Sequence, residues 1–441
     1  MISEKLPETK PLPPLWADYI ALIKREVVPA LGCTEPISVA LAAANCRELL
    51  GRVPERIEVL VSGNLFKNGM GVGVPGTGMT GLAVAAAVGT IGGLADAGLE
   101  VLRELTPAQV ERARTLIPNV TVDVKDVADV LYAEVRATAA NHVARVIIAG
   151  AHTRITLREI DGRALAPSTG LSSKPVSGES PPLPELHMRD IVDFAQHAPV
   201  AEIRFILEAA TMNQALADRG LQGLGLGIGK MLSDQVERKI LSDDLMTMAM
   251  RLSSAASDAR MDGAMLPAMS NSGSGNQGIS ATMPVVAAAR FLNSGEEKLT
   301  RALIMSHLVA ISIKTHQNKL SALCAASTAA MGSGAAITWL LGGNFEQISH
   351  CINNMIGDVT GIICDGAGSA CSMKVSTSSS AAVRAALMAI NDLHIPESQG
   401  IVSDDVDQTI ANLGRIATKG MLETDIEIIK IMRAKQRSSC N

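Results

Sequence analysis

Four of the seven cysteines, Cys324, Cys351, Cys364 and Cys371, lie in one short stretch of the 441-residue chain. Cys351 belongs to a run with helical spacing, QISHCINNMI, and is interpreted as a packing residue. The other three lie among Ala, Gly, Ser and Asp, where glycine lets the backbone approach a ligand closely. Three thiolates can hold a four-iron cluster with one iron left open, and an open metal position can bind a substrate. Their spacing matches neither zinc nor common ferredoxin patterns, so simple burial of these thiols is the alternative interpretation.

Cys33 is a separate candidate for chemistry. It lies in ALGCTEP at 30–36, and Pro36 is well placed as the first residue of a helix that would end at Gly51. The thiol would then lie at the helix N-terminus, where the partial positive charge favours a thiolate. We therefore expect a reactive cysteine here.

The polar loop SNSGSGNQG at 270–278 is the third candidate. Successive backbone N–H groups with Ser and Asn side chains form a donor site for a carboxylate or phosphate, although a plain surface turn would share this composition. Its letters resemble a loop of pyridoxal-phosphate enzymes, but no lysine between Lys239 and Lys298 could form the Schiff base. GLGLGIGK at 223–230 lacks the spacing of a nucleotide-binding loop. Three charged residues just before the loop are expected to orient it: Asp258, Arg260 and Asp262.

The elements that would position these residues follow from the periodicity of the apolar side chains. Helical spacing predicts a helix over 15–28, and alternation predicts strands over 56–74, with Lys67 and Asn68 in the loop between them. Alternation over 120–164 predicts a sheet, and the helical period dominates from residue 188 onward. The sequence thus predicts an α+β protein. We expect an N-terminal α/β domain with a small sheet at 15–165, carrying Cys33, a loop at 166–186, a largely all-α domain at 187–436 and a tail at 437–441.

Composition narrows the class of protein. Hydrophobic residues make up 47% of the chain and aromatic residues only 2%, which argues against a base-stacking nucleic-acid surface. The formal charge is −5 with scattered Lys and Arg, so no polyanion partner is expected. The N-terminus lacks an apolar signal segment and no stretch reads as a membrane span. We expect a cytoplasmic protein without nucleic-acid or membrane partners, and the many small apolar residues are compatible with a homodimer.

Seven motifs together resemble one known family. They are ALGCTEP (30–36), NLFKNGMGV (64–72), PGTGMTG (75–81), SAASDARM (254–261), LPAMSNSGSGNQGI (266–279), LSALCAASTAAMG (320–332) and MIGDVTGIICDGAGSACSMKVSTS (355–378). The chain resembles the L-cysteine desulfidase family (UPF0597 type) over roughly residues 15 to 435. The second half of that family is similar to the α domain of iron–sulfur L-serine dehydratases.

The resemblance implies an iron–sulfur lyase that converts L-cysteine into pyruvate, ammonia and sulfide. It implies that Cys324, Cys364 and Cys371 ligate a [4Fe–4S] cluster with one open iron, and that Cys33 accepts the Cα proton. We expect the α-carboxylate of the substrate to be bound by Asn271, Ser272, Ser274 and Asn276, with Lys67 or Asn68 assisting.

Other functions share most of these features. L-Serine dehydration would use the same cluster, because water and sulfide are both β-leaving groups. A non-catalytic sensor of sulfur amino acids would bind cysteine without releasing pyruvate. The sequence does not tell whether Cys440 in the polar tail ever ligates the cluster.

Overall fold

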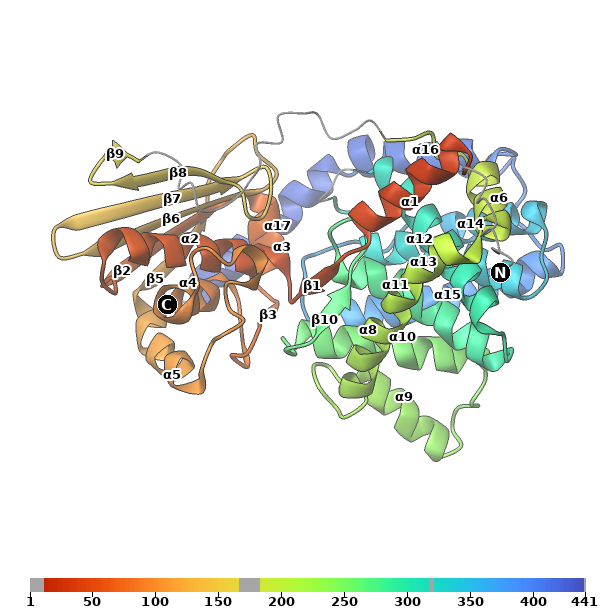
Figure 1. Cartoon of the computed structure of the whole chain (residues 1–441), viewed down its shortest axis with the longest axis horizontal. Helices are drawn as coiled ribbons and strands as arrows, with labels where there is room; N and C mark the ends of the chain where they lie inside the picture. Colours follow the sequence, from red (N-terminus) through yellow and green to blue (C-terminus); the bar gives the residue numbers. More distant parts are fainter. Residues whose placement is uncertain (1–11, 166–182, 318–320, 440–441) are drawn as a thin grey trace, which may run out of the picture.

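The computed structural model describes residues 12–165, 183–317 and 321–439, and it divides into a sheet part and a larger helical part (Figure 1). Most of the expected loop at 166–186 and Cys440 of the expected tail lie outside the described residues. The predicted α+β fold class is confirmed. No described helix is both long and apolar enough to cross a membrane.

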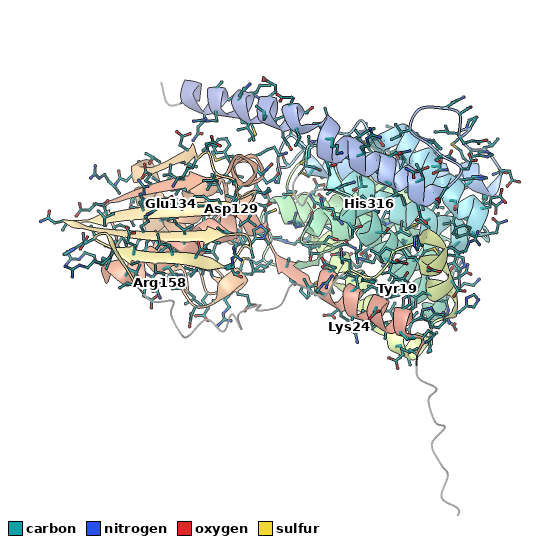
Figure 2. The ribbon with its side chains drawn as sticks, turned by 90° about the horizontal axis from the view of Figure 1, so that it is seen from above. Tyr19, Lys24, Asp129, Glu134, Arg158 and His316 are labelled. Carbon is teal, nitrogen blue, oxygen red and sulfur yellow. The ribbon has the colours of Figure 1, made fainter. Side chains whose placement is uncertain are left out.

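The sheet part is built on six strands. Their order is β5 (Val120–Val124), β2 (Arg56–Val61), β6 (Tyr132–Ala139), β7 (His142–Ala149), β8 (Ile155–Ile160) and β9 (Arg163–Ala164), antiparallel except for β2 with β5. Alternation places Ala133, Val135 and Ala137 of β6 in a core shared with α2 (Thr34–Leu50), α4 (Leu82–Gly92) and α5 (Pro107–Leu116). The opposite face carries charged side chains, including Glu134 (Figure 2).

The helical part surrounds a second hydrophobic core. Its helices are α6 (Met188–His197), α7 (Val200–Ile203), α8 (Leu207–Gly220), α9 (Ile228–Glu237), α10 (Leu245–Met261), α11 (Gly275–Phe291), α12 (Glu296–Thr315), α13 (Ala325–Leu340), α14 (Phe345–Val359), α15 (Cys371–Ile390) and α16 (Val406–Arg415). One short strand, β10 (Pro267–Met269), interrupts the expected all-α pattern and pairs with β1 (Pro29–Leu31). This pairing ties the chain just before Cys33 to the helical part.

The first described helix packs on the helical part, which follows later in the sequence, and the last described helix packs on the sheet part, which comes earlier. Tyr19 and Ile23 of α1 (Pro14–Glu26) belong to the core of the helical part, and Tyr19 and Lys24 lie on that side in Figure 2. Met432 of α17 (Leu422–Ser439) packs against the core of the sheet part. Helix α1 thus buries its apolar face in the helical part, whereas α17 is only partly buried where it contacts α3 and the sheet core. The expected domain boundaries do not account for this exchange.

The segment after β2 differs from its expected strand–loop–strand form. Ser62 accepts a hydrogen bond from the Leu65 N–H at 3.4 Å and caps helix α3 (Gly63–Gly69), so Lys67 and Asn68 lie on a helix rather than in a loop. Only the two-residue strand β3 (Gly73–Val74) follows, and it pairs with β4 (Met79–Thr80). The correction has a physical cause, because a serine N-cap favours a helix even in a short segment.

Candidate functional site

The three proposed iron ligands lie at or before the starts of two helices in the helical part. Cys324 is the N-cap of α13, Cys371 is the first residue of α15, and Cys364 lies in the connection before α15. The Cys324 N–H donates to the Ile362 carbonyl at 3.1 Å, and the Cys364 N–H donates to the Ala322 carbonyl at 2.7 Å. These bonds flank an antiparallel bridge, so both cysteine side chains leave it on the same face.

Burial and lysine charges dominate the electrostatics of these thiols. Burial raises the pKa of Cys371 to about 12 and also raises the pKa of Cys364, while each of these pKa values responds to the charge of Cys324 nearby. Lys67 and Lys374 act in the opposite direction on the pKa of Cys364. The thiols therefore lie close enough to influence one another, in a place where cations offset the charge of thiolates.

Lys314 and Lys374 were not anticipated from the sequence. Lys314 on α12 is buried, and burial lowers its pKa to about 8 although the nearby Cys364 and Cys324 thiols raise it. Lys374 on α15 donates to the Ile363 carbonyl at 2.8 Å and pairs with Asp365. Sequence periodicity does not identify these lysines as site residues, because their electrostatic role depends on which thiols lie near them in the folded chain.

The chemistry of the three thiols can be compared with what a bound metal group requires. Among the described residues, no three His, Cys, Asp or Glu side chains lie close enough to hold one metal ion. A cubane cluster instead places several irons and sulfides between its ligands, so its cysteine sulfurs stand farther apart than around one ion. Three thiols at or before helix starts, with the charges of Lys67, Lys314 and Lys374 nearby, have the chemistry to hold such a negatively charged group.

Cys33, the expected proton acceptor, packs next to Cys371, one of the three proposed ligands. It is the N-cap of α2, is 3% exposed, and packs in a small cluster with Val72, Met261, Ala367 and Cys371. The helix terminus and its backbone N–H groups were expected to favour a thiolate at Cys33, and burial opposes this effect. Burial raises the pKa of Cys33 to about 11, although the Arg260 guanidinium beside it lowers that pKa.

Glycines bring the sheet part and the helical part into backbone contact at the site. Gly71 and Gly368 form a bridge between the two parts. Gly366 has a φ of +115°, and a Cβ there would lie 2.4 Å from the Lys67 carbonyl oxygen. Only glycine fits this approach, which explains the GAG sequence between Cys364 and Cys371.

Lys67 forms an ion pair with a residue that was not among the site residues expected from the sequence. Its Nζ is fully buried and lies 2.5 Å from an Asp425 oxygen on α17. Asn68 is the next residue of α3 and is also buried. Because Asp425 is far away in the chain, no local pattern could have identified this pair.

The loop at 270–278 is a tight turn rather than one open cradle. Ser272 and Gly273 have φ values of +48° and +81°, and Asn271 and Ser274 exchange backbone hydrogen bonds of 3.1 and 3.0 Å across the turn. The four residues expected to bind a carboxylate therefore point in different directions. Ser274 caps α11 by accepting a hydrogen bond from the Gln277 N–H at 3.3 Å.

Asn271 and Asn276 have different surroundings. The Asn271 amide donates to the carbonyl of His307 at 3.2 Å, and its oxygen accepts from Gln277 at 2.8 Å, so this side chain fixes the turn within the core. Burial lowers the pKa of His307 to about 3. Asn276 instead contacts Met261, at 3.0 Å from the sulfur, and thus lies next to the Cys33 cluster.

A small cavity of about 140 Å³ adjoins this region. It lies between the two bodies, and Met261 lines both the cavity and the Cys33 cluster. The other lining residues are Gly71, Gly78, Met79, Thr80, Gly225, Asp262 and Ser369. This cavity therefore lies next to the Cys33 cluster.

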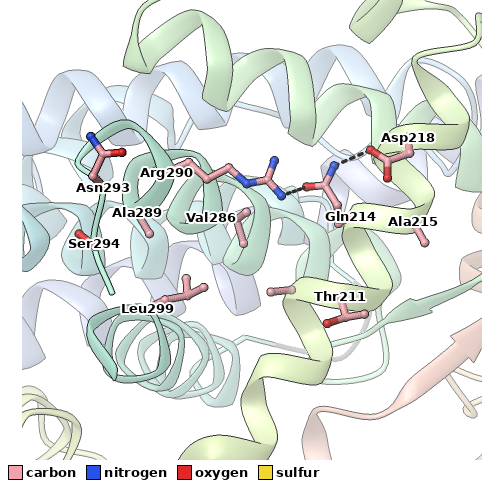
Figure 3. A pocket seen from close by; sticks show the side chains of 11 residues that line it. Thr211, Gln214, Ala215, Asp218, Val286, Ala289, Arg290, Asn293, Ser294 and Leu299 are labelled. Carbon is pink, nitrogen blue, oxygen red and sulfur yellow. Dashed lines mark hydrogen bonds between the residues drawn. The ribbon is translucent and has the colours of Figure 1, made fainter. Parts of the chain in front are cut away.

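A larger groove lies elsewhere, between α8 and the end of α11 (Figure 3). Arg290 donates to Gln214 at 2.7 Å, and Gln214 donates to Asp218 at 2.6 Å. None of the predicted site residues lines this groove. We therefore place the candidate site around Cys33 and Cys371, which pack with Met261 beside the smaller cavity.

Comparisons with known proteins agree with the two-part architecture. Residues 96–430 match the family described as serine dehydratase alpha chain. A UPF0597 protein of Aeromonas hydrophila is 75% identical over 422 residues, covering 96% of this chain and 97% of that protein. A UPF0597 protein of Shewanella pealeana is 53% identical over 429 residues, covering 96% of this chain and 99% of that protein. The similarity to these relatives extends through both the sheet part and the helical part.

Proposed function

This chain belongs to the family described as serine dehydratase alpha chain, and we propose that it is an iron–sulfur lyase that releases sulfide from L-cysteine. The observation that carries the proposal is the contact between two classes of thiol. Cys33 at the start of α2 packs against Cys371, which lies with Cys364 and Cys324 among buried lysines. A candidate proton acceptor and a candidate ligand set therefore lie in contact, beside the cavity that Met261 also lines.

The chain's own residues would carry the proton transfer. In the proposed step, the Cys33 thiolate takes the proton from Cα, the electrons of that bond form the Cα=Cβ double bond, and the Cβ–S bond breaks to release hydrosulfide. The aminoacrylate then becomes an imine, which water hydrolyses to pyruvate and ammonia. When bound by Cys324, Cys364 and Cys371, a [4Fe–4S] cluster would supply a Lewis-acidic iron for the leaving sulfur.

L-Serine is the second candidate substrate, because the matched family carries the serine dehydratase description. The two substrates differ only in the leaving atom. Protein reconstituted anaerobically with iron and sulfide should release pyruvate and sulfide from L-cysteine faster than it releases pyruvate from L-serine. A preference for serine would reassign the substrate, and a loaded protein inert toward both would remove the lyase proposal.

Substitution of Cys33 tests the proton acceptor directly. We expect Cys33→Ser to retain iron but to lose at least about a hundredfold in kcat, because a positioned acid–base group typically contributes that much. Cys46→Ser is the matched control, since Cys46 is also a buried cysteine of α2 but packs in the sheet core. Turnover by Cys33→Ser at the rate of the Cys46→Ser control would contradict the role of Cys33.

A further inference from the structure

Arg260, in the last turn of α10, is a buried cation without an acidic partner among the described residues. It is 7% exposed, and no described carboxylate oxygen lies within 4.0 Å of its nitrogens. One Nη donates to the Gly32 carbonyl at 3.1 Å, the other lies 3.6 Å from the Met261 sulfur, and Nε has no acceptor. A guanidinium has five N–H donors, and burying its charge unpaired is costly. Apart from the Cys33 thiol, whose pKa this guanidinium lowers, no acidic group of the described residues offsets its charge, and Nε remains free to bind an anion.

The start of α11 lies against the same guanidinium. A Cβ at Gly275, the first residue of α11, would lie 2.1 Å from the Arg260 Nε, so glycine is what permits the approach. The first N–H groups of a helix have no acceptor within that helix and carry partial positive charge. Arg260 and this helix start thus direct donors and positive charge to one place beside Asn276.

We propose that Arg260, with the N-terminus of α11, binds the α-carboxylate of the substrate. The assignment rests on the proposed lyase function and narrows its substrates to amino acids with a free carboxylate. It also gives the charged anchor that the neutral Asn and Ser side chains of the 270–278 turn do not provide.

The position of Arg260 relative to Cys33 fits the chemistry. Arg260 bonds the carbonyl of Gly32, the residue immediately before Cys33. A carboxylate carbon is one bond away from Cα, so the group that holds it must lie close to the base that takes the Cα proton. The guanidinium would also offset the carboxylate charge, which otherwise opposes negative charge developing on Cα.

Binding of two unreactive analogues tests the assignment. L-Alanine has the α-carboxylate but no leaving group, and L-alaninamide replaces the carboxylate with a neutral amide of similar size. Titration calorimetry on anaerobic, cluster-loaded protein should show L-alanine binding roughly 10- to 100-fold more tightly, as expected for a hydrogen-bonded charge pair. In Arg260→Gln this preference should fall to within about twofold, and in Arg260→Lys to an intermediate value.

Two further variants test whether a weaker preference for L-alanine comes from the position of the Arg260 guanidinium or from a general loss of a buried arginine. Gly275→Ala keeps the charge but displaces the guanidinium, so it should also weaken the preference for L-alanine. Arg301→Gln is the matched control, because Arg301 donates to the carbonyls of Ala195 and Ala198 away from the site and should leave the preference unchanged.

The outcomes distinguish this inference from the lyase proposal. Wild-type protein without a preference for L-alanine, or Arg260→Gln with the full preference, would overturn the assignment. If Arg260 served only Cys33, Arg260→Gln would keep the L-alanine preference and change the pH dependence of kcat. A protein inert toward cysteine and serine that still prefers L-alanine through Arg260 would refute the lyase function and leave the carboxylate site standing.

Discussion

At the scale of the residue, position decides what each cysteine does. Cys46 and Cys351 are fully buried in the two hydrophobic cores, and burial raises the pKa of Cys351 to about 12. Cys324, Cys364 and Cys371 instead start or precede helices and lie near lysines. The same side chain is thus an apolar packing group in one place and a candidate ligand in the other.

Iron content separates these two groups of cysteines. We expect Cys364→Ala and Cys371→Ala to lose most of the iron and acid-labile sulfide after anaerobic reconstitution, because each removes one of only three ligands. Cys351→Ala should retain both, since its thiol packs in the core. Equal iron in the Cys351→Ala and Cys364→Ala proteins would show that the proposed ligand set is wrong.

The cysteines could be predicted from the sequence because they lie in long motifs with recognisable neighbours. The partners of the site could not. The roles of Lys314 and Asp425 depend on groups far away in the chain. Lys314 lies near Cys364, and Asp425 forms an ion pair with Lys67. Arg260 was expected to orient the 270–278 loop, and its missing acidic partner is visible only in three dimensions.

Glu134 in the sheet gives the structure a pH dependence. Burial alone would raise the pKa of Glu134, but hydrogen bonds from Lys125, Tyr132, Arg145 and Arg136 hold it at about 2, below its usual 4.5. Because the unfolded state then binds the proton more readily, this carboxylate stabilises the fold above about pH 4.5. The contribution, roughly 2 to 3 kcal/mol, is lost as the pH falls toward 2.

Urea unfolding at two pH values measures this contribution. Glu134→Gln should be less stable than the wild type at pH 6, and the difference should shrink at pH 3. Glu58→Gln is the control, because Glu58 pairs with Arg136 at 3.2 Å but its side chain is 46% exposed and should contribute little. A wild-type advantage over Glu134→Gln that does not change with pH would disprove the assignment.

At the scale of the element, helix starts organise the site. Cys33, Ser274 and Cys324 are N-caps, and Cys371 is the first residue of its helix. The start of α2 could be predicted, because Pro36 lies in its first turn. Helix α3 could not, because its seven residues include four glycine or asparagine residues that are equally typical of a loop.

Asp425 fastens α17 to α3 through Lys67. Asp425→Asn would leave a fully buried ammonium group without its counter-charge, which costs roughly 3 kcal/mol. We expect hydrogen exchange of the α17 amides to become about 100-fold faster, because the helix opens more often. Lys67→Met combined with Asp425→Leu should restore much of the protection, since an apolar pair can replace a buried ion pair. Equally fast exchange in the single and double variants would contradict this coupling.

At the scale of the whole molecule, the site exists only where the two bodies meet. Cys33 and Lys67 come from the N-terminal half of the sequence, and the three proposed ligands come from the helical part. Helices α1 and α17 and the pairing of β1 with β10 connect the sheet part to the helical part. Apolar periodicity could predict each body, but it carries no information about which end helix packs on which body.

Gly366 tests whether this close approach is needed for the site. Gly366→Ala would place a Cβ 2.4 Å from the Lys67 carbonyl and would force a φ of +115° that costs about 1 to 3 kcal/mol. Because the collision is between backbones of the two bodies, neither can relieve it by a side-chain rotation. We expect the variant to keep its circular dichroism spectrum but to lose iron and turnover as the bodies separate.

Gly361→Ala is the matched control for this last prediction. Gly361 belongs to the same connection before α15, and a Cβ there would meet no atom within 4 Å. The control should therefore retain iron and activity. If Gly366→Ala binds iron as well as Gly361→Ala does, the contact between the bodies is not required to hold the ligands. The cluster would then be a property of the helical part alone, and only the approach of Cys33 and Lys67 would depend on the junction.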